Sequence, residues 1–314
     1  MQLTWLLGAQ IRPASVHQRA FGQGGLGSPA TQLMRAVGRS HKLGKMIDHN
    51  EQDNALPTVP SELNTLLRVL LDEVQHVLRG HFVGLYLEGS LANGDYDQDS
   101  DVDFVVVTDQ EISDVDFEAL QAMHERLDGQ TALRSLNLEG SYISRPALRR
   151  SDPKHASHLN LEWGSGERLK RVFHDETWNI QRYILRERGI TIVGPAPRTL
   201  IDPVSPDDLR QAMLAVLRGW ATHVLEHANE IAYREYQSYT VLSICRILYT
   251  LEQGEVVSKA KAAEWMKQRA GDCWGGLIDR AWIGRHNPHL PASSEDIDQT
   301  LDLLRYALAN GGLE

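Results

Sequence analysis

Between residues 63 and 78, leucine and valine recur at intervals of three and four. The residues that make this pattern are Leu63, Leu66, Leu67, Leu70, Leu71, Val74, Val77 and Leu78. Side chains with this spacing share one face of a helix, so the pattern predicts an amphipathic helix that ends near Arg79. Pro57, Pro60 and Ser61 precede it, and serine is a preferred residue at a helix N-terminus.

The patterns that follow indicate a change of structural class along the chain. Short apolar or alternating stretches predict strands at residues 82–87, 102–107 and 136–144, with a helix at 113–127. From residue 166 onward the period becomes helical, at residues 168–188, 206–233, 236–253, 259–269 and 295–309. We therefore expect an α+β protein in which a small α/β unit precedes a helical one, with the boundary near residues 150–165.

Composition narrows the class of protein. Of 314 residues, 42% are hydrophobic, which is enough for a substantial core. No stretch approaches the ~18 apolar residues of a membrane helix, and the first ten residues do not resemble a secretory signal. The two cysteines, Cys245 and Cys273, are too distant in sequence for a metal knuckle. We expect a cytoplasmic monomer with no membrane contact.

Charge is distributed unevenly. Residues 1–45 hold six basic residues and no carboxylate, whereas the rest of the chain has 26 basic and 42 acidic residues, a net charge of −16. The first 45 residues also show no sustained period, so we expect a flexible tail, or translation assigned upstream of a start at Met46. An acidic body repels phosphate backbones, which argues against nucleic acid and suits a cationic partner.

The strongest chemical signal lies between residues 88 and 116, where ten carboxylates occur without a lysine or arginine. Asp101 and Asp103 are two residues apart at the start of an apolar strand, so both side chains leave the same face. Paired carboxylates of this kind suit a Mg²⁺ ion that also binds substrate phosphates. Gly89 and Ser90 end the preceding strand, where glycine permits close backbone approach and exposed N–H groups can cradle phosphate. These features predict phosphoryl or nucleotidyl transfer.

Simpler interpretations of the acidic segment explain less. Asp95, Asp97 and Asp99 begin like a calcium-binding EF-hand loop, but Ser100 and Val106 stand where that loop needs glycine and glutamate. A solvated loop is a second simple interpretation of the segment. A turn-capping role for Asp101 leaves no reason for a charged Asp103 in an apolar strand.

Two motifs carry a family resemblance. Gly89-Ser90, followed after ten residues by Asp101-x-Asp103, resembles the polymerase-beta-type nucleotidyltransferase signature. Residues 242–265 are similar to the C-terminal domain of aminoglycoside adenylyltransferases of the streptomycin/spectinomycin type, as are Val193-Gly-Pro195 and Asp202-Pro-Val204. The resemblance implies a small mixed-sheet polymerase-beta-like nucleotidyltransferase domain at residues 58–155, then an all-helical C-terminal domain at residues 160–314.

The resemblance implies roles for five residues of the acidic site. Gly89 and Ser90 would bind the nucleotide, and Asp101 and Asp103 would hold it together with two Mg²⁺ ions. Glu139 matches the family's general base and would also contact the metal ions. A neighbouring strand can bring a carboxylate to that position, where it would deprotonate a hydroxyl. Without the family resemblance, Glu139 would be interpreted as an exposed carboxylate on a strand.

Two basic residues of the helical region match positions that meet the triphosphate of ATP in the family. They are Arg246 and Lys259. Arg246 lies in an apolar helix and therefore needs either a buried anion or a route for its charged end to reach water. Lys259 by itself reads as an ordinary residue at a helix start.

The resemblance is weaker on the acceptor side. Trp163 lies near the family's aromatic residue that contacts the aminoglycoside, although a lone tryptophan is more often part of a core. Where the family has acidic residues, this chain has Ala232 and Tyr236, with Glu230 and Glu235 close by. Cationic aminoglycosides need such carboxylates, so Glu230 and Glu235 are candidate acceptor-binding residues, together with Trp163 and Tyr236.

One further motif has a simpler explanation. His223, Glu226 and His227 match the H-x-x-E-H pattern of inverted zinc peptidases. The neighbouring Trp220 and Val224 supply an apolar helix face, which indicates packing and argues against zinc hydrolysis.

The expected activity is transfer of AMP from ATP to a hydroxyl of a small cationic acceptor such as streptomycin or spectinomycin, with release of pyrophosphate. One alternative is an acceptor hydroxyl on a protein or an RNA. Another is a non-catalytic, antitoxin-like nucleotide-binding module, against which the complete set of Ser90, Asp101, Asp103 and Glu139 argues. Neither the acceptor nor the base preference follows from the sequence.

Overall fold

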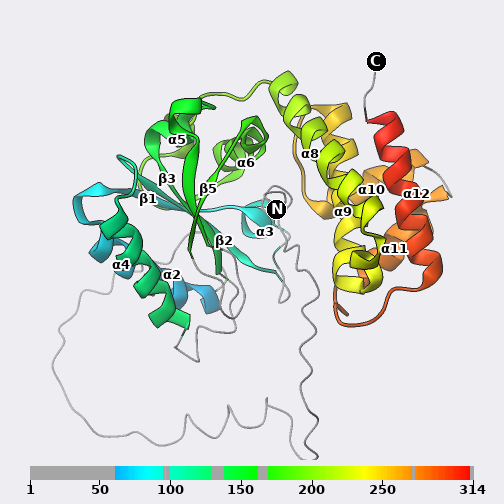
Figure 1. The fold of residues 1–314 in the computed structure, drawn as a ribbon, viewed down its shortest axis with the longest axis horizontal. Helices are drawn as coiled ribbons and strands as arrows, with labels where there is room; N and C mark the ends of the chain where they lie inside the picture. Colours follow the sequence, from blue (N-terminus) through cyan, green and yellow to red (C-terminus); the bar gives the residue numbers. More distant parts are fainter. Residues whose placement is uncertain are drawn as a thin grey trace, which may run out of the picture. The chain divides into compact units, whose positions relative to one another are not determined.

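The computed structural model describes residues 61–94, 96, 100–128, 138–161, 169–270 and 273–311. In these residues a mixed sheet is followed along the chain by a group of helices (Figure 1). The sheet has six strands in the order β5-β4-β3-β2-β1-β6. Their bounds are β1 Phe82–Leu87, β2 Val102–Thr108, β3 Leu138–Ser144, β4 Ser157–Leu161, β5 Lys170–Phe173 and β6 Ile190–Val193. The expected α+β class, with a small mixed sheet before a helical region, is confirmed.

Strands β2 and β3 are parallel, and the other neighbouring strands are antiparallel. A parallel pair needs a crossover connection, and helix α4 (Asp114–Asp128) lies in that connection. The two strands therefore begin at the same end of the sheet. In their register Asp103 faces Glu139.

Helices cover both faces of the sheet (Figure 1). On one face α2 (Ser61–Leu78) and α4 pack together, and His124 of α4 contacts Phe104 and Tyr142. On the other face Tyr86, Val105 and Val107 and their neighbours pack under α5 (Arg145–Arg149), α6 (Asn179–Arg188) and α7 (Pro197–Leu200). Alternate residues of a strand point to opposite faces, so Asp103 shares its face with Val105 and Val107.

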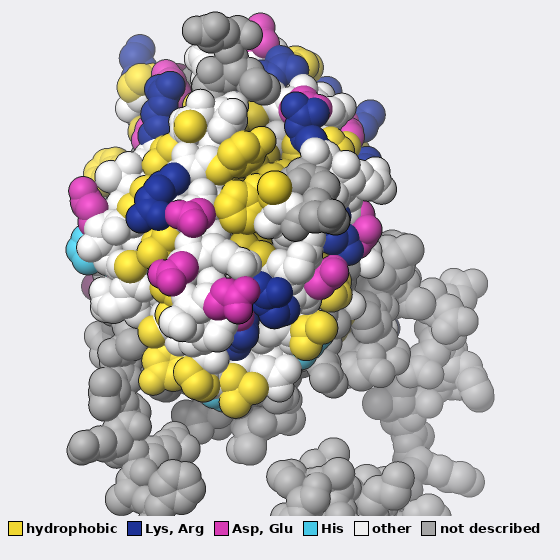
Figure 2. Space-filling view, turned by 90° about the vertical axis from the view of Figure 1, so that its right-hand side faces the viewer, with side chains coloured by type: hydrophobic (Ala, Val, Ile, Leu, Met, Phe, Trp, Pro, Cys, Tyr) yellow, Lys and Arg dark blue, Asp and Glu magenta, His cyan; other side chains and the backbone are white. Residues whose placement is uncertain are grey.

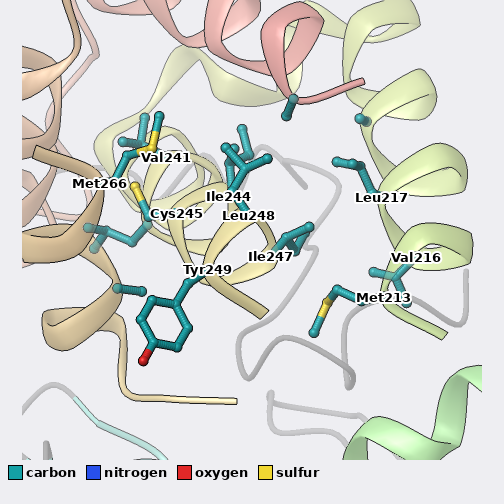
Figure 3. Packing of buried hydrophobic residues seen from close by; sticks show 14 of the residues in the cluster. Met213, Val216, Leu217, Val241, Ile244, Cys245, Ile247, Leu248, Tyr249 and Met266 are labelled. Atoms are coloured by element: carbon teal, nitrogen blue, oxygen red, sulfur yellow. The ribbon is translucent and has the colours of Figure 1, made fainter. Parts of the chain in front are cut away.

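The helical region has its own core. Its elements are α8 Pro206–Glu226, the short 3₁₀ helix η5 Ala228–Ala232, α9 Arg234–Gln253, α10 Lys259–Ala270, α11 Gly275–Gly284 and α12 Ser294–Asn310. Helix α9 is central, because α8, α10, α11 and α12 all pack against it. Every residue of α9 from Tyr236 to Leu251 is buried. In Figure 3, Ile247 of α9 lies toward Met213 and Val216 of α8, whereas Cys245 lies toward Met266 of α10.

Three strands and helix α11 were missed, and two expected helices have other bounds. The helix expected at residues 206–233 is divided into α8 and η5. The single helix expected at residues 168–188 is wrong, because this stretch holds β5, a 3₁₀ turn at Glu176–Trp178 and only then α6. Strand β5 lies at the edge of the sheet and is largely exposed, so it lacks the apolar alternation that marks a strand. Strands β4 and β6 and helix α11 were also missed, and α11 both begins and ends with glycine.

Some expectations fall outside the described residues. These are the expectations for residues 1–45, for Trp163 and for the acidic positions Asp95, Asp97 and Asp99. The boundary near residues 150–165 stays a prediction, and β5 and β6 lie on its C-terminal side. In the described part of the chain, no helix is long and apolar enough to cross a membrane.

Candidate active site

Three carboxyl groups lie side by side across three neighbouring strands. Glu88 directly follows β1, and its backbone N–H donates to the carbonyl of Asp103 in β2 at 3.1 Å. Asp103 in turn faces Glu139 in the parallel register of β2 and β3. All three residues continue the strand positions whose side chains lie on the α6 face of the sheet. The fold thus brings Asp103 and Glu139 together, as the resemblance implied.

The turn after β1 lies directly against this cluster. Gly89 has a φ of +64°, and a Cβ added there would lie 1.8 Å from Oδ2 of Asp103. Glycine is needed at this position both for the left-handed backbone and for the close approach. The Ser90 hydroxyl in the same turn is buried and has no hydrogen-bond partner among the described residues. A buried hydroxyl of this kind is suited to binding a ligand oxygen.

The electrostatics of the cluster favour a bound cation. Burial, followed by the charges of Glu88 and Asp101, raises the pKa of Asp103 well above its usual value. Lys259 and Arg246 act in the opposite direction. Glu88, Asp101 and Asp103 thus gather near two cations, and carboxylate oxygens are ligands that Mg²⁺ prefers.

Metal binding would need more than these side chains. No three His, Cys, Asp or Glu side chains within the described ranges are arranged to hold a metal ion. Mg²⁺ in phosphate-transferring sites usually takes one or two carboxylates and completes its shell with substrate phosphates and water. Asp101 and Asp103 fit that pattern, and the metal roles expected for them and for Glu139 stay predictions.

Glu88 was missed as a site residue. Its side chain is buried, and Oε1 accepts a hydrogen bond of 3.4 Å from Nε2 of Gln181 in α6. Oε2 has no partner among the described residues. Burial raises the pKa of Glu88 to about 8, so the group is largely protonated at neutral pH. The sequence held a signal for this, because Glu88 directly continues a wholly apolar strand into the Gly89 turn.

Two cations of the helical region face the carboxylate cluster. Arg246 lies on α9 and is 8% exposed, and Lys259 is the first residue of α10. Burial, followed by the charges of Arg246 and Arg285, lowers the pKa of Lys259 to about 7, while Asp101 and Asp103 raise it. These mutual effects place Arg246 and Lys259 within electrostatic range of the aspartates, and their expected contact with a triphosphate stays a prediction.

Tyr239 of α9 contacts Lys259 and interacts electrostatically with Arg246 and Glu139. Sequence reasoning did not select it. Its ring carries the Lys259 ammonium, with Nζ 4.8 Å from the ring centroid. Burial raises the pKa of the Tyr239 phenol; Arg246 lowers it, and Glu139 is among the groups that raise it. Buried residues occupy every side of α9, so no helical period in the sequence separated Tyr239 from core residues.

The candidate acceptor residues are only partly brought together. Tyr236 is buried, and its hydroxyl accepts a 2.9 Å hydrogen bond from the Trp220 indole. Glu230 lies close enough to raise the pKa of Tyr236, and both its carboxylate oxygens lie 3.2 Å from Nε2 of His223. Glu235 is exposed, and its backbone N–H donates to the carbonyl of Pro288.

The histidine pair of α8 has a structural explanation. The rings of His223 and His227 stack at 4.4 Å, and Nδ1 of His227 lies 2.9 Å from the carbonyl of His223. His223 also contacts Glu230. These contacts involve both histidines of the zinc-peptidase pattern.

Comparison with known families gives a match in each region of the chain. Residues 67–149 match the family model described as nucleotidyltransferase domain. Residues 199–308 match the family model described as aminoglycoside adenylyltransferase, C-terminal domain. The matches follow the order of the sheet and the helical region.

Individual relatives are distant in sequence. The chain is 23% identical over 254 residues to an aminoglycoside (3'') (9) adenylyltransferase of Escherichia coli, which covers 77% of this chain and 93% of the relative. It is 22% identical over 213 residues to a spectinomycin 9-adenylyltransferase of Campylobacter jejuni, covering 66% and 78%.

A solved structure shares the fold. It is the crystal structure of a spectinomycin adenyltransferase from Enterococcus faecialis with ATP and spectinomycin. The TM-score is 0.60 at 15% sequence identity, and the match covers 78% of this chain and 98% of the other.

Proposed function

Because the chain belongs to the aminoglycoside adenylyltransferase family, we propose that it transfers AMP from ATP to a hydroxyl of a small cationic acceptor. The observation that carries this proposal is the register pair of Asp103 and Glu139, with Arg246 and Lys259 in electrostatic range of Asp103. This arrangement sets two carboxylates of a phosphate-transfer site against cations that suit a triphosphate.

Glu139 and the two cations have separate tasks in the proposed reaction. Glu139 takes the proton of the acceptor hydroxyl, and the acceptor oxygen bonds to the α-phosphorus of ATP. The bond between that phosphorus and the oxygen that bridges to the β-phosphate breaks, and pyrophosphate leaves. Arg246 and Lys259 neutralise the negative charge that develops on the leaving group.

Asp101 and Asp103 would hold Mg²⁺ together with phosphate oxygens of ATP. When bound, Mg²⁺ neutralises phosphate charge and favours the ionised acceptor oxygen. Gly89 and Ser90 would lie against the phosphates, since the turn has an unpartnered buried hydroxyl beside Asp103.

For the acceptor we infer an aminoglycoside, and the probes are spectinomycin and streptomycin. Two related enzymes are named for spectinomycin. Glu230 is the carboxylate that lies near Tyr236, and it would bind an ammonium group in place of its contact with His223.

The test is pyrophosphate release from ATP and Mg²⁺ with each drug, followed by mass spectrometry of the drug. We expect release and a drug that has gained AMP. Asp103→Asn should abolish both, whereas Asp109→Asn, at an exposed position just after β2, should leave them unchanged. ATP binding without release would contradict the acceptor assignment, and absence of ATP binding would contradict the whole proposal.

A further inference from the structure

We propose that Arg285 binds the phosphates of ATP together with Arg246 and Lys259. This inference rests on the proposed function, because it assigns a further residue to the nucleotide site. Sequence reasoning did not select Arg285, which lies 26 residues beyond Lys259 and directly follows α11.

Packing of α11 against α9 places Arg285 next to the site. Arg285 directly follows α11, and its backbone N–H donates to the carbonyl of Ala281 at 3.1 Å. The preceding Gly284 is in tight contact with α9, because a Cβ added there would lie 2.6 Å from Oγ of Ser238. Ser238 is the residue before Tyr239, whose ring carries the Lys259 ammonium.

The Arg285 side chain is supported by an aromatic ring. Its guanidinium carbon lies 4.8 Å from the ring centroid of Trp282, one turn earlier in the chain. Stacking uses the flat face of a guanidinium, whereas its N–H donors lie at the edge and suit phosphate oxygens. Both Arg285 and Trp282 are partly exposed, so a ligand can reach them.

The resulting group of cations is suited to a polyanion. Arg285 and Arg246 each act on Lys259 by charge repulsion, so the three cations lie within electrostatic range of one another. Repulsion among like charges is relieved when an anion binds among them. In the proposed reaction the triphosphate of ATP, and afterwards pyrophosphate, is the polyanion at this place.

The test compares Arg285→Gln with wild-type protein in binding ATP, pyrophosphate and adenosine by calorimetry. Loss of a charged hydrogen bond predicts weaker binding of ATP and pyrophosphate by about 10-fold to 100-fold. Adenosine, which has no phosphate, should bind equally to both proteins. Arg285→Lys keeps the charge but not the planar fork, and it should weaken ATP binding less.

A matched control is Arg269→Gln. Arg269 also stacks on a tryptophan, with its guanidinium carbon 5.8 Å from the Trp265 ring, and it pairs with Glu252. This variant should bind ATP like the wild type. ATP binding by Arg285→Gln and Arg285→Lys equal to wild type would overturn the assignment of Arg285 and leave the proposed function intact. An equal loss of adenosine binding would overturn it too, and a wild-type protein that binds no ATP would overturn both proposals.

Discussion

Glu88 shows how a single residue of this site depends on its environment. It is buried beside Asp103, and burial raises its pKa to about 8 from a usual value of 4.5. The folded protein therefore binds this proton more tightly than the unfolded chain does between these two pH values. The contribution of Glu88 to stability is present at low pH and is lost as the pH rises toward 8.

Replacement of Glu88 by glutamine should remove this loss. Glutamine stays neutral and keeps an acceptor for Gln181. As the pH rises from 5 to 8.5, the free energy of unfolding of Glu88→Gln should therefore increase by about 1–3 kcal/mol relative to that of the wild type. Urea unfolding without nucleotide or Mg²⁺ measures this. Glu118→Gln, at an exposed position of α4, should track wild type. A constant difference between Glu88→Gln and wild type across this range would contradict the prediction.

Glu139 is expected to act on the acceptor and not on ATP. Glu139→Gln keeps the size of the buried side chain but cannot take a proton, so kcat should fall by about 10²-fold to 10⁴-fold. The dissociation constant of ATP should stay within a factor of about two of wild type, in contrast to Arg285→Gln. Steady-state kinetics and calorimetry check the two values. Loss of ATP binding would contradict the base role.

At the scale of elements, the packing of α11 on α9 depends on the absence of a side chain at Gly284. An alanine there would bring Cβ to 2.6 Å from Oγ of Ser238 and 3.0 Å from Cδ of Arg234. Ser238 is fully buried, so the helices have to separate. The separation would also move Arg285, which directly follows Gly284.

Gly284→Ala should therefore lower the free energy of unfolding by about 1–3 kcal/mol and weaken ATP binding. Gly275→Ala is the matched control at the other end of the same helix, where a Cβ would meet nothing within 4 Å. That variant should be neutral or slightly stabilising, because alanine favours the helix. Thermal unfolding and calorimetry distinguish the two, and equal stabilities would show that α11 adapts.

The elements differ in how well the sequence predicts them. Strands β1 and β2 are apolar and central, so their patterns were read correctly, whereas β4, β5 and β6 are short and β5 is exposed. Asp101 and Asp103 could be selected as candidates because two neighbouring carboxylates at a strand start carry a local signal. Tyr239 and Arg285 could not, because they meet Lys259 only through the packing of α9, α10 and α11.

At the scale of the whole molecule, ionisable groups occur both on the surface and in the interior. The face of the helical region in Figure 2 carries acidic and basic side chains in alternation with hydrophobic ones. Inside the sheet region, His124 and His158 are buried and His174 is half-buried, and all three are neutral at pH 7. Burial lowers the pKa of His124 and His158 to about 3, and burial together with Arg182 lowers that of His174 to about 4.

Hydrogen bonds hold these histidines in their neutral form. Arg182 can only donate, so Nε2 of His174 accepts at 3.2 Å, and its Nδ1–H then donates to Nδ1 of His158 at 3.0 Å. His124 lies 2.7 Å from the hydroxyl of Tyr142. Protonation of any of the three would place an unpaired charge in the core.

The protein should therefore lose stability in mild acid. In the unfolded chain these histidines bind protons from a pKa of 6.5 downward, whereas the folded protein does not until about pH 4. The free energy of unfolding should fall as the pH is lowered from 6.5 to 4.5. Urea titrations at fixed pH values measure this, and His174→Asn should reduce the slope by about one proton. Equal slopes for His174→Asn and the wild type over this range would contradict the assignment.

Helix α9 has a consequence for how the acceptor can change. Tyr236 lies at one end of its buried span and Arg246 ten residues further on, which is about 15 Å along a helix axis. Because four other helices pack against α9, the distance between Tyr236 and Arg246 is fixed. In the proposed function, Tyr236 lies on the acceptor side and Arg246 on the phosphate side. A new acceptor preference would then evolve by exchange of single side chains on α9, while the distance between the acceptor and the triphosphate stays constant.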